Sequence, residues 1–182
     1  MNCLHEAQGM VGILGVMKLN NFKSDLEYSL NERENKMFDN FYYRVFPGLV
    51  KIDFIEDMEM QKEGIDKILV FESGYEITVD EKKRRKDYGD ILLEIWSVWE
   101  QRKRGWLYTC KCDYIVYAVM PTRKIYLLPV LLLKKAWLEN CNVWQELYQE
   151  VSAINPGYIT KSIAIPTNVL LPELSKQMEQ VF

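Results

Sequence analysis

The sequence predicts an α/β (α+β) fold in which a mixed central sheet is flanked by helices. Two observations predict it. Stretches with apolar residues at helical spacing alternate with shorter stretches rich in β-branched and aromatic residues, and no internal repeat divides the chain. The expected order is helix, three strands, helix, two strands, helix and short strand, of which the last helix and strand form a C-terminal extension.

The first expected element is one long helix that begins near residue 24. Ser24 and Glu27 have the spacing of a capping box, and apolar residues recur with helical period until Pro47-Gly48 ends the pattern. Three strands should follow, joined by turns at residues 56–64 and at Ser73-Gly74. Their expected ranges are 49–55, 65–71 and 75–81.

The second half of the chain predicts another helix, a hairpin and the extension. Asp90 can cap a helix over residues 91–99. A hairpin is expected about Pro121-Thr122-Arg123, and apolar residues at helical spacing predict a helix over residues 131–151. The hairpin strands should cover residues 114–120 and 124–128, and a final strand residues 160–165. Trp96, Trp99, Trp137 and Trp144 would then lie on helices, where packing is favoured over base stacking.

Length and composition predict one domain with a sizeable core. The chain has 182 residues, of which 48% are hydrophobic and 27% charged, so residues 17–182 are expected to form a single domain. Met17 could serve as a start, so residues 1–16 are expected to be a mobile extension. No stretch approaches the roughly 18 apolar residues of a membrane span, and no signal peptide is evident, so a soluble, cytoplasmic protein without a membrane partner is expected.

Composition also narrows the chemistry. The net charge of −3 argues against a generally basic nucleic-acid coat protein, but a local basic groove is compatible with it. Basic runs at residues 82–86 and 102–104 could line such a groove, although solvated loop or strand ends are the more common explanation of such runs. The chain has one histidine, His5, and its four cysteines lack zinc-ribbon spacing and are expected to be reduced. A metal site would therefore use oxygen ligands.

Three residues on two neighbouring strands suggest such a site. Side chains alternate across a sheet, so Asp80 and Lys82 share one face while Glu81 points to the other. If the strand over residues 65–71 pairs with the next one, Asp66 can lie beside Asp80. Two carboxylates and an ammonium suit Mg²⁺, which binds one or two protein carboxylates and keeps several waters. The competing interpretation is an exposed salt-bridge cluster at a strand end.

The acid on one strand and the Asp80-Glu81-Lys82 tripeptide on the next resemble the PD-(D/E)XK nuclease superfamily, over roughly residues 24–120. The resemblance implies a restriction-endonuclease-like αβββαβ core and a Mg²⁺- or Mn²⁺-dependent nuclease that hydrolyses DNA. Residues 61–66, 79–82, 87–94, 105–106 and 113–115 are similar to uncharacterised phage and prophage proteins of this type. A phage or mobile-element origin, in bacterial or infected-host cytoplasm, would follow.

The resemblance assigns catalysis to Asp66, Asp80 and Lys82, with the metal on the two aspartates and on a glutamate of the first helix. Either Glu34 or Glu27 could be that glutamate, and Glu34 is preferred. Gln61, Arg84, Arg85 and Glu94 are further candidates that would contact substrate or support the catalytic side chains. DNA is the expected partner, and a homodimer would place two sites for two strands. The alternative is a nuclease-fold module that binds DNA or a host protein without catalysis.

Overall fold

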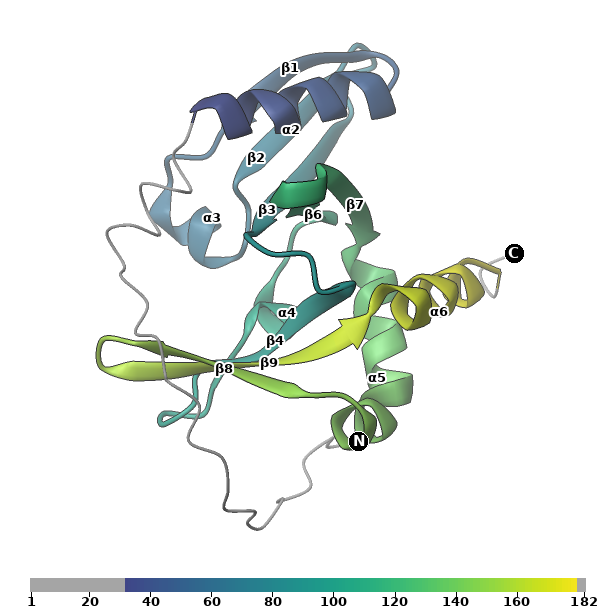
Figure 1. The fold of residues 1–182 in the computed structure, drawn as a ribbon. Helices are drawn as coiled ribbons and strands as arrows, with labels where there is room; N and C mark the ends of the chain where they lie inside the picture. The colour runs from purple at the N-terminus through teal and green to yellow at the C-terminus, as the bar shows by residue number, and fades with distance from the viewer. Residues whose placement is uncertain (1–31, 180–182) are drawn as a thin grey trace. The chain divides into compact units, whose positions relative to one another are not determined.

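The structure is a computed structural model that describes residues 32–179. The described chain forms two compact units (Figure 1). Unit 1 contains residues 89–108 and 132–179, and unit 2 contains residues 32–88 and 109–131. The proposed extension at residues 1–16 lies outside the described residues. The assignment of residues 17–182 to a single nuclease-like domain stays a prediction.

Unit 2 is built on a five-stranded mixed sheet in the order β1-β2-β3-β6-β7. Strand β3 runs parallel to β6, whereas the other neighbouring pairs are antiparallel. A parallel pair needs a long crossover, and the chain between β3 and β6 supplies it with segments of unit 1. The strands are β1 (Leu49–Phe54), β2 (Lys67–Phe71), β3 (Glu76–Arg84), β6 (Tyr114–Val119) and β7 (Lys124–Pro129).

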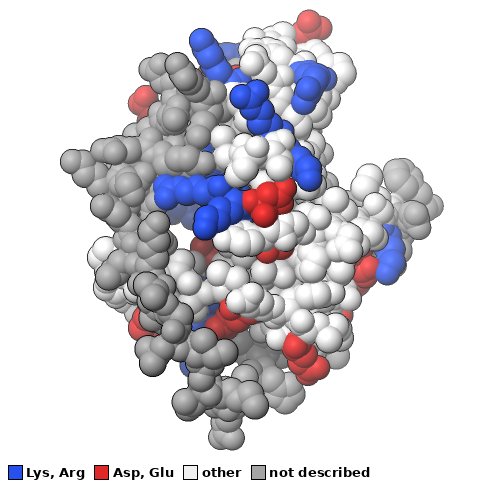
Figure 2. All heavy atoms as spheres, in the orientation of Figure 1, with Lys and Arg blue, Asp and Glu red and all other residues white. Residues whose placement is uncertain are grey.

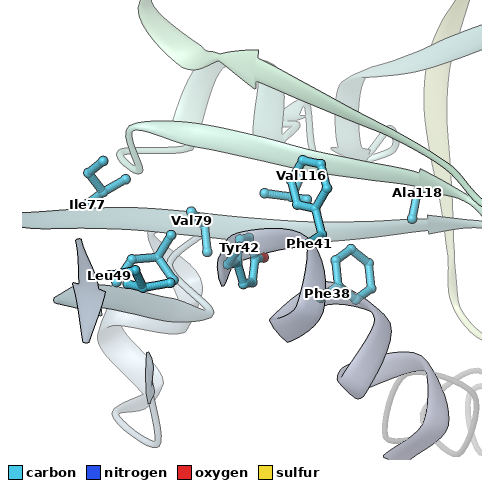
Figure 3. Packing of buried hydrophobic residues seen from close by; sticks show 9 residues of the cluster. Phe38, Phe41, Tyr42, Leu49, Ile77, Val79, Val116 and Ala118 are labelled. Atoms are coloured by element: carbon cyan, nitrogen blue, oxygen red, sulfur yellow. The ribbon is translucent and has the colours of Figure 1, made fainter. Parts of the chain in front are cut away.

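Helix α2 (Glu32–Val45) packs on one face of this sheet (Figure 3). Phe38 and Tyr42 are four residues apart, so they lie on the same side of the helix, and both are fully buried. They meet Val79 of β3 and Val116 of β6 in the hydrophobic core. The remaining buried members of that core are Phe41, Leu49, Leu69, Ile77 and Ala118.

Two short helical segments shape the connections of unit 2. Residues 56–64, expected as a turn, contain helix α3 (Met58–Lys62). Its N-cap is Asp57, whose side chain accepts hydrogen bonds from the main-chain N–H groups of Glu59 and Met60 at 2.8 and 2.9 Å. The turn of the β6-β7 hairpin is the 3₁₀ helix η1 (Met120–Thr122), so the hairpin expected about Pro121 is confirmed.

Unit 1 has its own antiparallel sheet of four strands in the order β5-β4-β9-β8. The strands are β4 (Asp90–Val98), β5 (Lys103–Arg104), β8 (Glu150–Asn155) and β9 (Tyr158–Pro166). The helices are the short α4 (Trp106–Thr109), α5 (Val130–Leu147) and α6 (Thr167–Glu179), with α4 and α5 each having end residues in unit 2. The sequence predicted one sheet, so this second sheet is a correction.

The predicted helix over residues 91–99 is wrong, because this segment is strand β4. Ile91, Leu93 and Ile95 are buried, whereas the intervening Leu92 and Glu94 are partly exposed, which is the period of a strand. The apolar residues fit helical spacing as well, so local sequence does not decide between the two. Pairing with β9, about 70 residues later in the chain, selects the strand.

Other elements differ mainly at their ends. The helix expected to reach residue 151 ends at Leu147, and residues 150–155 form β8 instead. Helix α6 was not predicted. In the described chain, no helix is long and apolar enough to cross a membrane. The coarse prediction of a mixed α/β fold with helices on a mixed sheet is confirmed.

Candidate metal and catalytic site

The two faces of β3 carry different chemistry. Ile77 and Val79 point into the α2 core, and Glu81 accepts a hydrogen bond from the hydroxyl of Tyr42 on α2 at 2.7 Å. On the other face, the ammonium of Lys82 lies 2.7 Å from Oδ1 of Asp80. The alternation that the sequence predicts therefore places Asp80 and Lys82 together and Glu81 apart from them.

Asp66 is held beside Asp80 by the antiparallel pairing of β2 and β3. The register sets Lys67 opposite Val79, so the preceding Asp66 comes level with Asp80. The main-chain N–H of Asp66 donates to the carbonyl of Val79 at 2.9 Å. In return, the N–H of Glu81 donates to Oδ2 of Asp66 at 2.8 Å. Main-chain hydrogen bonds thus fix this carboxylate at the start of β2.

Asp80 is a buried carboxylate with unused hydrogen-bonding capacity. It is 1% exposed, and its Oδ2 receives no hydrogen bond within the described chain. The pKa of Asp80 is raised to about 6, mainly by burial, and the charge of Asp66 contributes to the rise. Lys82 opposes this shift. A second positive charge near Oδ2 would be stabilised strongly here, because burial weakens solvent screening.

Gly64 and Cys110 lie beside Oδ2 of Asp80. The sequence analysis did not predict that either residue belongs to the site. Gly64 has φ +74°, and a Cβ there would lie 2.9 Å from Sγ of Cys110 and 3.3 Å from Oδ2 of Asp80. Only glycine leaves this space open. Cys110 and Cys112 are free, buried thiols with their sulfurs 2.9 Å apart. The hydrogen bond between the two thiols lowers the pKa of Cys110.

A buried ionic network braces the opposite face of the same strand. The ammonium of Lys67, 2% exposed, lies 2.8 Å from Oε1 of Glu81 and 2.9 Å from Oδ1 of Asp39 on α2. It also lies 4.6 Å from the ring centre of Phe54. Burial raises the pKa of Glu81, and Lys67 counteracts that rise. This network connects β2, β3 and α2 on the face of the sheet opposite Asp80 and Lys82.

Three further candidates belong to unit 2. Gln61 is exposed on α3 and donates from Nε2 to the carbonyl of Ile55 at 2.7 Å, a contact that stabilises the turn. Arg84 ends β3 on the same face as Asp80 and Lys82, with its guanidinium 5.0 Å from the ring centre of Tyr88. Arg85 follows it and is exposed. Figure 2 shows Lys and Arg side chains gathered in patches on the visible face, despite the net charge of −3.

The remaining candidates belong to unit 1 or to the part of the chain whose side chains are not described. Glu94 belongs to β4 of unit 1, where its Oε1 accepts a hydrogen bond from the main-chain N–H of Trp106 at 3.2 Å. Glu34 lies within α2, and its side chain is outside the described part of the structure. Glu27 lies outside the described residues. The helix glutamate that the resemblance implies therefore stays a prediction.

The chemistry of the donor set fits a hard divalent cation held by few protein ligands. Asp66 and Asp80 together supply carboxylate oxygens, including the uncompensated Oδ2. Among residues 35–178, whose side chains are described, no group of three or more His, Cys, Asp or Glu side chains could hold a metal ion. Two carboxylates suffice for Mg²⁺, which completes its coordination with water and substrate oxygens.

Comparisons of the chain with protein-family models, curated proteins and solved structures gave no match.

Proposed function

We propose that this chain is a Mg²⁺- or Mn²⁺-dependent nuclease that hydrolyses DNA phosphodiester bonds, with its active site at Asp66, Asp80 and Lys82. One observation carries the proposal. A carboxylate that is 1% exposed, with one oxygen that no donor of the described residues contacts, lies level with a second carboxylate and 2.7 Å from an ammonium. A buried carboxylate oxygen without a hydrogen-bond partner is costly, and groups with perturbed pKa values are frequent at functional sites.

The order of elements in unit 2 supports the same proposal. A helix precedes three antiparallel strands, and a further strand pairs in parallel with the third. This order is similar to the αβββαβ core of the PD-(D/E)XK superfamily. The chain departs from the pattern between β3 and β6, where β4, β5 and the four-residue α4 replace a long helix.

The proposal gives each side chain a distinct task. Asp66 and Asp80 would hold the divalent ion, which when bound polarises the scissile phosphate and activates water. Lys82 would offset the negative charge that develops on the phosphate oxygens. Asp80 would bind the ion in its ionised form, so metal binding should weaken as the pH falls below the pKa of about 6 that Asp80 has without metal.

The direct test is a cleavage assay with the full chain on plasmid and on end-labelled linear and single-stranded DNA. Cleavage should require Mg²⁺ or Mn²⁺ and stop in EDTA. Asp66→Asn, Asp80→Asn and Lys82→Ala should each lower the rate at least about 100-fold, the scale reported for removing one group that stabilises transition-state charge.

Two exposed residues provide matched controls for these changes. Glu76→Gln neutralises an exposed carboxylate at the start of the same strand, and Lys51→Ala removes an exposed ammonium on β1. Both variants should cut at the rate of the unaltered chain. Equal rates for Asp80→Asn and Glu76→Gln, in preparations free of contaminating nuclease, would contradict the assigned site.

A second candidate function is DNA or host-protein binding without catalysis. The ion pair between Lys82 and Asp80 favours it, because this ammonium already neutralises one of the two carboxylates. Calorimetry separates the alternatives: a nuclease should bind Mn²⁺ with a stoichiometry near one, and Asp80→Asn should abolish that binding. A chain that binds DNA but neither Mn²⁺ nor Mg²⁺ would be the binding module.

A further inference from the structure

Unit 1 carries a ladder in which cations alternate with aromatic rings. In order, its members are Lys161, Trp99, Arg102, Trp96, Arg104 and Tyr108. The ammonium of Lys161 and the guanidinium of Arg102 each lie 3.8 Å from the ring centre of Trp99. Arg102 also lies 5.7 Å from Trp96, and Arg104 lies 4.6 Å from both Trp96 and Tyr108. We call these six residues the cation-ring ladder.

Sheet register builds the ladder. Trp96 of β4 is paired with Arg104 of β5 on one side and with Lys161 of β9 on the other, so the three side chains share one face. Arg102 enters from the connecting turn with φ 54°, a left-handed conformation that costs a non-glycine residue about 1 kcal/mol or more. An arginine therefore occupies a position that glycine or asparagine would fill with less strain.

Within residues 32–179, one of the three cations in the ladder is paired with a carboxylate. Lys161 forms an ion pair of 2.7 Å with Glu150. Within the described chain, neither Arg102 nor Arg104 forms an ion pair, and the adjacent Lys103 is exposed. Ring faces attract cations, but each such contact contributes only about 0.5–1 kcal/mol at an exposed site. Two guanidinium groups thus contact the ring of Trp96, and neither has a carboxylate partner within the described chain.

We propose that the cation-ring ladder binds the phosphate groups of a DNA strand, with Arg102 and Arg104 as the contacts. A guanidinium stacked on a ring uses its face and leaves the N–H groups at its edge free, and these match phosphate oxygens in a bidentate fork. Stacking also limits the conformations of each arginine, which lowers the entropy lost on binding.

Phosphates suit the ladder better than bases do. Trp96 is 8% exposed, and guanidinium groups lie against its ring, so a base could not stack there without displacing them. The expected recognition is therefore of the backbone and independent of base sequence. This inference adds a DNA contact outside the candidate site, and it rests on the proposed function only for the choice of DNA as the phosphate-bearing partner.

The test measures DNA binding by fluorescence anisotropy in EDTA, which prevents metal-dependent cleavage, at a series of KCl concentrations. The full chain is compared with the double variant Arg102→Ala/Arg104→Ala. Each lost phosphate contact lowers the slope of log K against log [salt] by about 0.7–0.9. We expect the slope to fall by about 1.4–1.8 and the affinity at low salt to fall at least tenfold.

Two further variants separate charge from folding. Arg102→Lys/Arg104→Lys keeps both charges, so its salt slope should match that of the unaltered chain while its affinity falls a few-fold. Lys51→Ala/Lys62→Ala removes two exposed lysines of unit 2 and should change neither quantity. An alanine double variant that melts normally and keeps the full salt slope would overturn the proposal, as would a lysine double variant that loses as much slope as the alanine one.

Failure of the ladder and failure of the active site give different results. If the ladder is wrong and the nuclease right, the alanine double variant binds DNA as tightly as the unaltered chain, and DNA is still cut. If the nuclease is wrong and the ladder right, no cleavage occurs with any metal, but the salt slope still depends on Arg102 and Arg104.

Discussion

The main-chain N–H of Glu81 donates a 2.8 Å hydrogen bond to Oδ2 of Asp66. The same residue directs its side chain to the opposite face of the sheet, where it meets Lys67 and Tyr42. The middle residue of the Asp-x-Lys tripeptide is thus a link between the buried network and the candidate site. Its backbone orients one carboxylate, and its side chain anchors the strand that carries the other carboxylate.

The pH dependence of stability should report the buried carboxylate. The folded pKa of Asp80, about 6, exceeds the ordinary value of 3.8, so the folded state retains the proton over this range more than the unfolded state does. Stability relative to Asp80→Asn should therefore be greatest below pH 4 and fall as the pH rises to about 6, by about 3 kcal/mol in all. Urea denaturation between pH 4 and 7.5 measures it. Glu76→Gln should show no comparable trend, and a parallel pH profile for the unaltered chain and Asp80→Asn would contradict the assigned burial.

A methyl group at residue 64 should disturb the site. Gly64→Ala combines the strain of φ +74° with contacts of 2.9 and 3.3 Å to Cys110 and Asp80. Gly74 has φ +80° and nothing within 4 Å of the added Cβ, so Gly74→Ala isolates the backbone strain. We expect about 1 kcal/mol of destabilisation for Gly74→Ala and about 1–3 kcal/mol more for Gly64→Ala. Urea denaturation measures both losses. Equal losses would show that Cys110 and Asp80 move aside without a measurable cost in stability.

Removing the buried ammonium should destabilise unit 2 severely. Lys67→Met leaves Glu81 without its cation in a position 10% exposed, and breaking such a pair costs about 3–5 kcal/mol. Lys51→Met breaks an exposed pair with Asp53 and should cost less than about 1 kcal/mol. The double variant Lys67→Met/Glu81→Gln should recover part of the loss, because the more buried of the two carboxylates that Lys67 contacts is then neutral. Thermal denaturation gives the three values, and a loss of under 1 kcal/mol for Lys67→Met would contradict this account.

Metal binding should stabilise the fold in proportion to its saturation. At a Mn²⁺ concentration of 100 times the Kd, a single site adds about 2.7 kcal/mol to the free energy of unfolding. The gain should disappear in Asp66→Asn and in Asp80→Asn and persist in Glu76→Gln. Denaturation with and without Mn²⁺ measures it. An equal gain in all four proteins would assign the metal to a different site.

A methyl group at residue 105 should prevent β5 from pairing normally with β4. A Cβ on Gly105 would lie 2.4 Å from the carbonyl oxygen of Glu94, a main-chain atom that cannot move aside as a flexible side chain can. The N–H of Gly105 also donates to the carbonyl of Ile95 at 2.8 Å. Gly105→Ala should cost about 3 kcal/mol or more, at the upper end of the range for overpacking. Gly157→Ala, with φ +87° and open space around the added Cβ, should cost only about 1 kcal/mol of backbone strain, and unfolding measurements compare the two variants.

Local sequence was sufficient for much of unit 2. The apolar spacing in α2 and the alternation along β3 depend on residues next to one another in the chain, so the helix, the strands and the shared face of Asp80 and Lys82 could be predicted. The level placement of Asp66 and Asp80 needed the register of β2 and β3, which the prediction assumed. Cys110 and Gly64 gave no local signal, because they meet only when residues 46 positions apart are brought together.

Unit 1 shows the limit of local patterns. Residues 90–98 fit both a helical and a strand spacing, and the strand forms because β9 offers main-chain hydrogen bonds and buried partners along its whole length. The cation-ring ladder depends on that pairing, because Trp96 lies beside Arg104 and Lys161 only when residues 90–98 form a strand. The predicted helix therefore gave no indication of the ladder. The acid-acid-lysine pattern was therefore determined by sequence alone, because alternation within a strand is local. The burial of Asp80 and the ladder of Arg102 and Arg104 were decided by tertiary structure, because both require contacts between distant segments.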